Sequence, residues 1–446
     1  MEIGERRLGS LIVLRPIGRI DTMTSPAFQE RLLAAVESGL VDIVVDFSAV
    51  EYVSSAGLRA LMTAAKVKPK ALRLAAIGLN PVVQEIFAIS RFHHVLPVLD
   101  SVEEVIRSWE ARPQAGEMRD AAAHSASDIR LHFWGTRGSL PAPLGEAAVR
   151  AKVREAVLAA RGRALATEAA VDEFIDRELP FAVRGTFGGN TSCVEIADGG
   201  DEYLLCDLGT GAREFGNRVL AQHGAGRPQR FNVVLSHVHW DHIMGFPFFG
   251  PAYIPGNVIR IHGCHATLHE ALLRQQSDPC FPVHLTSLGA TIEFVELKPG
   301  VEHRIAGFSV TPIKQMHAGD SYGYRFSRGG KTIVYSTDCE HRDTADANYR
   351  FVEFFRNADV LIFDAMYSLA DSISVKEDWG HSSNIVAVEL AQLSQVRRLV
   401  LFHHEPVFDD GMIEGVLKET KRFEEVSRDG HAVEVISAYD GLELTV

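Results

Sequence analysis

The chain has 446 residues, of which 46% are hydrophobic and 23% are charged, a composition typical of folded globular proteins rather than of long disordered segments. Its formal net charge is −13, from 45 Lys and Arg against 58 Asp and Glu, which argues against a protein that binds long nucleic acid through its phosphates. The five cysteines are odd in number and lack paired spacing, which favours reduced thiols over a disulfide scaffold. Without a signal peptide or 18 consecutive apolar residues, the sequence predicts a cytoplasmic protein with no membrane span.

Residues 111–128 are rich in Ala, polar residues and turn formers, which predicts a linker between two domains. Residues 1–110 hold 12 Lys and Arg against 13 Asp and Glu, so almost all of the excess negative charge lies beyond them. We therefore predict a first domain over residues 1–110 and a second, with a separate task, over residues 129–446.

Strands and helices alternate in residues 1–110. The sequence predicts strands over residues 11–14, 42–47 and 72–77, and helices over residues 25–37, 55–66, 81–89 and 101–110. This alternation predicts an α/β fold, with helices packed on a mostly parallel sheet.

The second domain is rich in strands separated by Gly, Asn and Asp turns and by helical segments, which predicts two sheets with helices outside. One segment departs from this pattern. Residues 145–179 are Ala-rich with helical periodicity and carry six Lys and Arg against seven Asp and Glu. We predict an inserted helical hairpin, and favour a surface cover over a lid or a dimer contact.

Four polar side chains are concentrated directly after the apolar strand over residues 231–235. They are His237, His239, Asp241 and His242 of the motif HVHWDH. The two-residue period of a strand aims His237 and His239 the same way. An isolated histidine is often a core residue, but three imidazoles and a carboxylate this close together need partners when buried. The motif therefore predicts a metal site, with Zn²⁺ favoured and Mn²⁺ or Fe as competitors.

The motif and the GFPFFGP segment that follows it resemble the metallo-β-lactamase superfamily, and its phosphodiesterase-like branch in particular. The segments FWGTRGS at residues 133–139 and GGNTSCVEI at residues 188–196 resemble the opening strands of that branch. The resemblance implies an αββα sandwich over residues 129–446. It also implies that Asp207, in CDLGTG, supports the site without binding metal.

The same resemblance implies two divalent metal ions bridged by a carboxylate and a hydroxide. The implied ligands are His237, His239 and His317 for one ion, Asp241, His242 and His403 for the other, and Asp338 between them. Three alternatives stay open. Asp338 could cap a helix, His317 could be a surface turn residue, and His404 could replace His403, although the family's strand-then-His pattern favours His403.

Two further segments, VLIFDAMYS and WGHSSN, resemble the acid and histidine pair of the branch that contains tRNA 3′-end endonucleases and cyclic phosphodiesterases. The resemblance implies that His381 is a general acid or phosphate clamp oriented by Asp364, with Asp241 also counted among the catalytic groups. Alternatively, GHSS only caps the helix over residues 384–393. The pair favours phosphate esters over lactams and thioesters. Because the sequence lacks a basic tRNA-binding arm, a cyclic nucleotide or other small cyclic phosphodiester is the predicted substrate.

The segment DFSAVEYVSSAGLRALM, at residues 46–62, resembles the STAS domain of anti-sigma factor antagonists. GRID at residues 18–21 matches the same family. The resemblance implies that Ser55, at the start of a helix, is phosphorylated by an anti-sigma-type serine kinase. This sequence has Ser54 where the family often has Asp, so a helix-capping role for Ser55 stays open.

The predicted function is a dinuclear metal-dependent phosphodiesterase regulated through a STAS domain. Its predicted partners are a small phosphodiester substrate, a switch kinase and a second copy of the chain in a homodimer. Two alternatives remain: another metallo-hydrolase, such as a thioesterase or lactonase, and a STAS signalling adaptor that binds an anti-sigma-type kinase.

Overall fold

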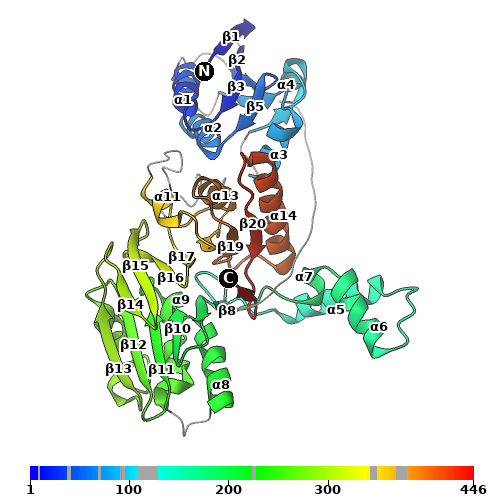
Figure 1. The fold of residues 1–446 in the computed structure, drawn as a ribbon. Coiled ribbons are helices and arrows are strands. Elements are labelled where there is room, and N and C mark those ends of the chain that lie inside the picture. The colour runs from blue at the N-terminus through cyan, green and yellow to red at the C-terminus, as the bar shows by residue number, and fades with distance from the viewer. Residues whose placement is uncertain are drawn as a thin grey trace.

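The computed structural model describes residues 1–8, 11–37, 42–68, 72–90, 92, 96–108, 129–223, 228–341, 349–367 and 379–446. These residues form two α/β domains, one stacked on the other (Figure 1). The predicted linker over residues 111–128 lies outside the described residues. Among the described helices, none is long and apolar enough to cross a membrane.

The N-terminal domain is built on a five-stranded sheet in the order β1-β2-β4-β6-β7, whose strands are Ile3–Leu8, Leu11–Pro16, Asp42–Asp46, Leu74–Ile77 and Val98–Leu99. Only the β1–β2 pair is antiparallel, which confirms the predicted mostly parallel sheet. Strands β3 (Gly18–Ile20) and β5 (Val50–Val53) pair separately. The helices are α1 (Ser25–Glu37), α2 (Ser55–Val67), α3 (Pro81–Ile89) and α4 (Val102–Ser108). The sequence prediction missed β1 because its exposed charged residues give no apolar run.

The second domain contains two seven-stranded sheets, which confirms the predicted architecture. The first has the order β13-β12-β11-β10-β9-β8-β21, with strands Thr291–Glu296, Val258–Gly263, Arg230–Val234, Glu202–Cys206, Cys193–Ala197, Arg130–Gly135 and Glu443–Thr445. The second has the order β14-β15-β16-β17-β18-β19-β20, with strands His303–Ile305, Phe308–Gln315, Ser321–Arg328, Lys331–Ser336, Val360–Asp364, Arg398–Phe402 and Glu434–Ser437. Buried side chains of both sheets, including Phe133, Val234, Tyr335 and Phe402, form one core between them.

Helices cover the outer faces of this sandwich (Figure 1). The first sheet is covered by α8 (Gly211–His223) and α10 (Leu268–Gln275). Shorter elements complete this layer: α9 (Trp240–Ile243) and the 3-10 turns Phe246–Phe248, Gly250–Tyr253 and Leu285–Ser287. On the second sheet lie α11 (Arg350–Phe355), α13 (Asn384–Leu393) and α14 (Asp410–Ser427).

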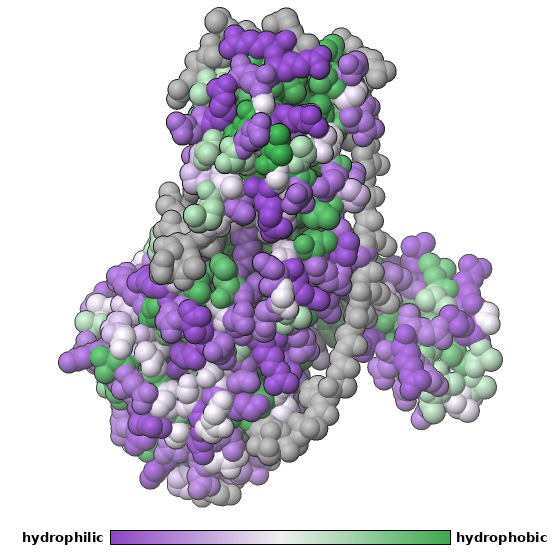
Figure 2. All heavy atoms as spheres, turned by 45° about the horizontal axis from the view of Figure 1, so that its top comes forward, coloured by the Kyte–Doolittle hydropathy of each residue, from purple (hydrophilic) through white to green (hydrophobic). Residues whose placement is uncertain are grey.

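An inserted arm stands away from the sandwich in Figure 1 and consists of α5 (Glu146–Ala159), α6 (Glu168–Glu178) and α7 (Phe181–Arg184). Figure 2 shows hydrophobic patches on this arm. Val149, Val153 and Val157, spaced four residues apart along α5, are each about half exposed. Lys152 fixes the base of the arm through an ion pair of 2.6 Å with Asp410 of α14. The dimer contact considered for this segment stays a prediction.

The N-terminal domain packs on the helical layer of the second sheet. Its apolar core is continuous with the apolar layer formed by α11, α13, α14 and the strands beneath them. Helix α3 lies against α14 (Figure 1), and Arg422 of α14 forms an ion pair with Glu85 of α3. The two domains therefore share a hydrophobic interface as well as polar contacts.

Gly57 gives a test of packing inside the N-terminal domain. A Cβ at this position of α2 would lie 2.7 Å from the Ile20 Cγ2 atom and 2.9 Å from the Ile20 carbonyl oxygen. We expect Gly57→Ala to lower the free energy of unfolding by about 1–3 kcal/mol, because the core has no room for the methyl group. Thermal unfolding followed by circular dichroism measures the loss.

Gly415 in α14 provides the matched control, because a Cβ there meets no atom within 4 Å. Gly415→Ala should be neutral or stabilising by up to about 1 kcal/mol, since Ala has the higher helix propensity. Equal destabilisation by both substitutions would contradict the steric argument.

Candidate metal centre

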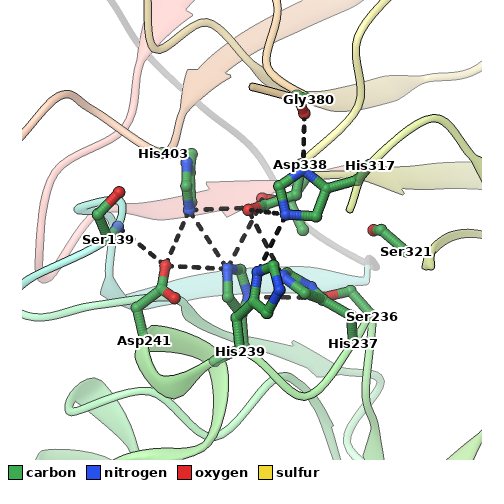
Figure 3. Close-up of polar contacts among 12 residues, drawn as sticks. Ser139, Ser236, His237, His239, Asp241, His317, Ser321, Asp338, Gly380 and His403 are labelled. Carbon is green, nitrogen blue, oxygen red and sulfur yellow. Dashed lines mark hydrogen bonds and ion pairs between the residues drawn. The ribbon is translucent and has the colours of Figure 1, made fainter. Parts of the chain in front are cut away.

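Side chains from both sheets meet at one edge of the sandwich, where several strands end (Figure 3). Strand β11 leads to His237 and His239, and the short α9 that follows carries Asp241 and His242. The remaining members follow three strands of the other sheet: His317 after β15, Asp338 after β17 and His403 after β19. The structure thus brings together all seven residues predicted as metal ligands.

One half of the centre consists of His237, His239 and His317. The His317 Nε2 atom lies 3.0 Å from His239 Nδ1, and both His237 Nε2 and His317 Nε2 lie 3.7 Å from the Asp338 carboxylate. Burial lowers the pKa of all three imidazoles, so they are held in the neutral form that binds metal ions. His317 donates from Nδ1 to the Gly380 carbonyl at 2.9 Å, which leaves the Nε2 lone pair facing the centre.

The other half consists of Asp241, His242, Asp338 and His403. The His403 Nε2 atom lies 3.2 Å from an oxygen of Asp241, from an oxygen of Asp338 and from His242 Nε2. Burial alone would raise the pKa of both carboxyl groups, but the neighbouring imidazoles lower it, so both are ionised. Asp338 contacts both halves and lies between them.

This donor set fits divalent cations. The buried His237 Nε2 atom has no hydrogen-bond partner among the described residues, although an orphaned buried polar atom is costly. His242 and His403 also direct two ring nitrogens at each other across 3.2 Å. Cations between these groups would supply the missing partners. Imidazole and carboxylate together form the donor set that suits zinc.

Asp207 supports the centre from beneath. It accepts a hydrogen bond of 2.8 Å from His242 Nδ1, which turns His242 Nε2 toward the centre. It also accepts 2.7 Å bonds from the Ser236 amide, the Ser236 hydroxyl and the Tyr335 hydroxyl. The sequence prediction placed Asp207 in such a role but missed Ser236 and Tyr335. Ser236 adjoins the motif, whereas nothing local marks Tyr335, which lies 128 residues from Asp207.

The backbone is strained at three residues of the centre that follow the ends of strands. Asp207, Asp338 and His403 have φ angles of 61°, 44° and 61°, in the left-handed region that non-glycine residues rarely adopt. Each follows a strand within two residues, so the chain turns there and directs its side chain into the site. Such conformations cost about 1–3 kcal/mol each and tend to cluster at functional sites.

The sequence prediction missed two backbone groups that bond side chains of the centre, the Ser139 amide and the Gly380 carbonyl. The Ser139 amide donates a 2.9 Å hydrogen bond to Asp241 and fixes the orientation of that carboxylate. Gly380 has a φ of +81°, and a Cβ there would lie 2.2 Å from His317 Nδ1. Only glycine lets the backbone carbonyl come this close to the imidazole.

His381 and Asp364 form a pair beside the centre. His381 Nδ1 donates to the Asp364 carboxylate at 2.9 Å, and the imidazole stacks on His403 with a centroid distance of 5.1 Å. Burial alone would lower the pKa of His381, but the charge and hydrogen bond of Asp364 raise it to about 9. The GHSS segment does cap α13, because the Ser383 hydroxyl accepts a hydrogen bond from the Val386 amide, but His381 of the same segment bonds Asp364 instead.

The alternative last ligand, His404, points away from the centre. Its Nε2 atom donates to the Ala438 carbonyl at 2.9 Å, and burial lowers its pKa to about 3. His403 lies in the cluster instead. His317 is not a surface turn residue, because its side chain is only 4% exposed.

Ser55, the predicted phosphorylation site, is the first residue of α2 and is only 2% exposed. The capping alternative for Ser55 is wrong, because the side chain of Ser54 caps α2 by accepting from the Gly57 amide. Ser55 instead faces the second domain, where its amide donates to the Glu389 carboxylate at 2.8 Å and its hydroxyl contacts the same group.

Comparisons with known proteins agree with this arrangement. A family model described as a beta-lactamase superfamily domain matches residues 203–404, and one described as "Mlab, STAS domain" matches residues 3–99. Ribonuclease Z of Picosynechococcus is 34% identical over 264 residues, which cover 47% of this chain and 78% of that protein. The chain belongs to the beta-lactamase superfamily. It is a metal-dependent hydrolase, and its N-terminal domain is a STAS domain.

Further relatives match one domain each. YhfI of Bacillus subtilis, named as a probable metallo-hydrolase, is 26% identical over 261 residues, or 54% of this chain and 93% of that protein. BtrV of Bordetella bronchiseptica, named as a candidate anti-sigma factor antagonist, is 29% identical over 111 residues, or 25% of this chain and 96% of that protein. A crystal structure of YhfI covers 72% of this chain and all of that one, with a TM-score of 0.48 and 19% identity.

Adjacent histidines allow a test of the hydrolase centre. We expect His403→Ala to hold about one divalent ion fewer per chain than the wild type, because the substitution removes a donor from one half of the centre. His404→Ala should keep the wild-type metal content, since that imidazole bonds the Ala438 carbonyl. Elemental analysis of the purified variants measures both. Equal metal contents in the two variants would contradict the assignment.

Proposed function

We propose that the chain is a dinuclear metal-dependent phosphodiesterase that acts on a small cyclic phosphodiester, such as a cyclic nucleotide, under the control of its STAS domain. One observation carries the reaction class. The paired His381 and Asp364 lie directly beside the metal centre, with His381 Nδ1 at 2.9 Å from Asp364 and 3.9 Å from Asp338. This is where an acid that protonates a leaving oxygen is needed.

The proposed ligands follow the two halves of the centre. His237, His239 and His317 would hold one ion, Asp241, His242 and His403 the other, and Asp338 would lie between both. Two divalent ions, zinc being the first choice, supply Lewis acidity and lower the pKa of water at such a site. Asp207 and Gly380 orient the imidazoles His242 and His317 for this role.

The protein's own contribution to bond cleavage is a proton. With a pKa of about 9, His381 is protonated at neutral pH. Its Nδ1 proton is engaged by Asp364, so Nε2 is the atom that donates to the leaving alkoxide. Asp364 holds the ring in place and is itself fixed by the Met366 amide at 3.1 Å and the Cys339 amide at 3.4 Å.

Charge and exposed aromatic side chains support the substrate class. The inserted arm has no excess of basic residues for an RNA backbone, and the hydrolase half carries most of the net negative charge. Trp240, between His239 and Asp241, is 70% exposed, and Trp379, next to Gly380, is 60% exposed. Exposed indole rings adjoining the centre along the chain are suited to stacking on a nucleobase.

The regulatory half of the proposal is a switch protein that recognises the STAS domain. An anti-sigma-type serine kinase acting at Ser55 remains the proposed partner. Because Ser55 is covered by Glu389, such a kinase would reach it only after the two domains separate.

Leaving groups of different basicity test the role of His381. We expect His381→Ala to lower kcat by about 10²–10⁴-fold on a 3′,5′-cyclic nucleotide, whose alkoxide leaving group needs a proton. Turnover of bis-p-nitrophenyl phosphate should fall far less, since p-nitrophenolate leaves without one. Steady-state kinetics on the zinc-loaded variants measure both, with a lactone and a thioester as comparison substrates. An equal loss on both phosphodiesters would contradict proton donation and leave a clamp role.

Trp240 tests the base-stacking proposal. We expect Trp240→Ala to raise KM for thymidine 5′-p-nitrophenyl phosphate about tenfold, the effect of losing one base–aromatic stack. KM for methyl p-nitrophenyl phosphate, which has the same leaving group and no base, should stay unchanged. Leu140 is 59% exposed and lies outside the aromatic pair, so Leu140→Ala serves as the surface control. A parallel rise in KM for both diesters would count against a base site at Trp240.

A further inference from the structure

The STAS domain and the hydrolase meet through a small set of polar contacts inside an apolar interface. At the start of α2, the Ser55 amide and hydroxyl both donate to the two oxygens of Glu389, a residue of α13. One turn further along α2, Arg59 donates from Nη2 to the His341 carbonyl at 2.9 Å. Both contacts join α2 to hydrolase segments that also carry residues of the catalytic centre.

His341 lies three residues after Asp338, so the carbonyl that Arg59 bonds belongs to the same loop as this residue of the metal centre. The His341 ring is 1% exposed and packs between aromatic side chains, with Phe363 stacked at 5.2 Å and the Tyr349 hydroxyl at 2.9 Å from Nδ1. Arg59 therefore bonds the backbone of a buried residue in the loop that carries Asp338.

A second set of bonds joins this loop to the acid. The His341 amide donates to the Ser382 hydroxyl at 3.3 Å, and that hydroxyl donates to the Cys339 carbonyl at 2.6 Å. Ser382 directly follows His381, and the Cys339 amide donates to Asp364. Helix α13, which starts at Asn384, then carries Glu389 back to Ser55. The STAS domain thus contacts two hydrolase segments. Arg59 bonds the segment that carries Asp338, and Ser55 bonds the helix that follows His381.

The Ser55 contact is sensitive to charge. Glu389 is covered by the docked domain, and burial raises the pKa of its carboxyl group. The Ser55 side chain is only 2% exposed, so a negative group at position 55 would face the Glu389 carboxylate without water to screen it. Such a charge would force the domains apart and remove Arg59 from His341.

We propose that Arg59 of the STAS domain is a positioning residue for the hydrolase centre, and that the Ser55–Glu389 contact is the latch that keeps it seated. This inference rests on the proposed phosphodiesterase function. The docked STAS domain holds the Asp338 and His381 segments in their catalytic positions. A negative charge at position 55 separates the domains and so releases both segments.

The first experiment replaces the donor in the full-length, zinc-loaded protein. Arg59→Met removes the hydrogen bond to His341, and should lower kcat on a 3′,5′-cyclic nucleotide about tenfold or more while KM and metal content stay unchanged. Arg59→Lys, which can still donate to the carbonyl, should recover most of that loss. A wild-type kcat in Arg59→Met, or the same loss in Arg59→Lys, would overturn the positioning role.

The second experiment tests the latch. Ser55→Asp should increase amide hydrogen exchange in α2 and α13 and lower kcat to about the level of Arg59→Met. In the double variant Ser55→Asp with Glu389→Gln, the amide can donate to the new carboxylate, so protection and kcat should both return. Ser55→Ala, which introduces no charge, should remain docked and active. Domain separation in Ser55→Asp without loss of kcat would overturn the inference, and so would failure of the double variant to restore docking.

Exchange rates also separate this inference from the function on which it rests. If the wild-type protein hydrolyses no diester, the proposed function fails. Amide exchange over residues 339–341 and 381–383 still decides the inference, because undocking by Ser55→Asp should raise exchange in both segments. Unchanged exchange there in an undocked protein would show that the STAS domain does not position them.

Discussion

Imidazole nitrogens and carboxylate oxygens of the hydrolase centre approach one another to 3.0–3.2 Å, and most of the side chains that carry them are buried. Lone pairs that face each other in this way are unfavourable unless cations lie between them. Several other features follow from that constraint. Strands of two different sheets end at one edge, three residues adopt strained left-handed conformations, and a glycine lets its carbonyl touch His317. The Asp207 network beneath the site holds His242 in the one tautomer that faces the centre.

The sequence was most informative where chemistry and chain order coincide. Four donors of the centre lie within six residues after a strand, so the two-residue period and the turn were enough to predict that they meet. The satellites His317, Asp338 and His403 could be found only by resemblance, because each stands alone in its segment. The strand and helix alternation of the N-terminal domain was equally readable, since each element has a local apolar pattern.

Features that depend on distant pairs could not be read in this way. Ser55 and Glu389 are 334 residues apart, and neither segment shows a pattern that points to the other. Ser55 was therefore judged by its helix position alone, whereas the docked hydrolase decides its surroundings. Tyr335 was unpredictable for the same reason. Its alternation within β17 marks a core residue, but not that its hydroxyl ends on Asp207. Strand β1 was missed for a local reason instead: it is an edge strand, and its charged residues leave no apolar pattern to identify it.

The covered start of α2 has a consequence for any protein that recognises this face of the STAS domain. The hydrolase half is then a competing ligand tethered to the same chain. If the docked form made up 99% of the population, a partner's apparent dissociation constant would be about 100 times its intrinsic value, because only the open fraction binds. This coupling is reciprocal, so a bound partner would weaken docking of the hydrolase half by the same factor. The amount of such a partner in the cell would then set what share of the chains keeps Arg59 on His341.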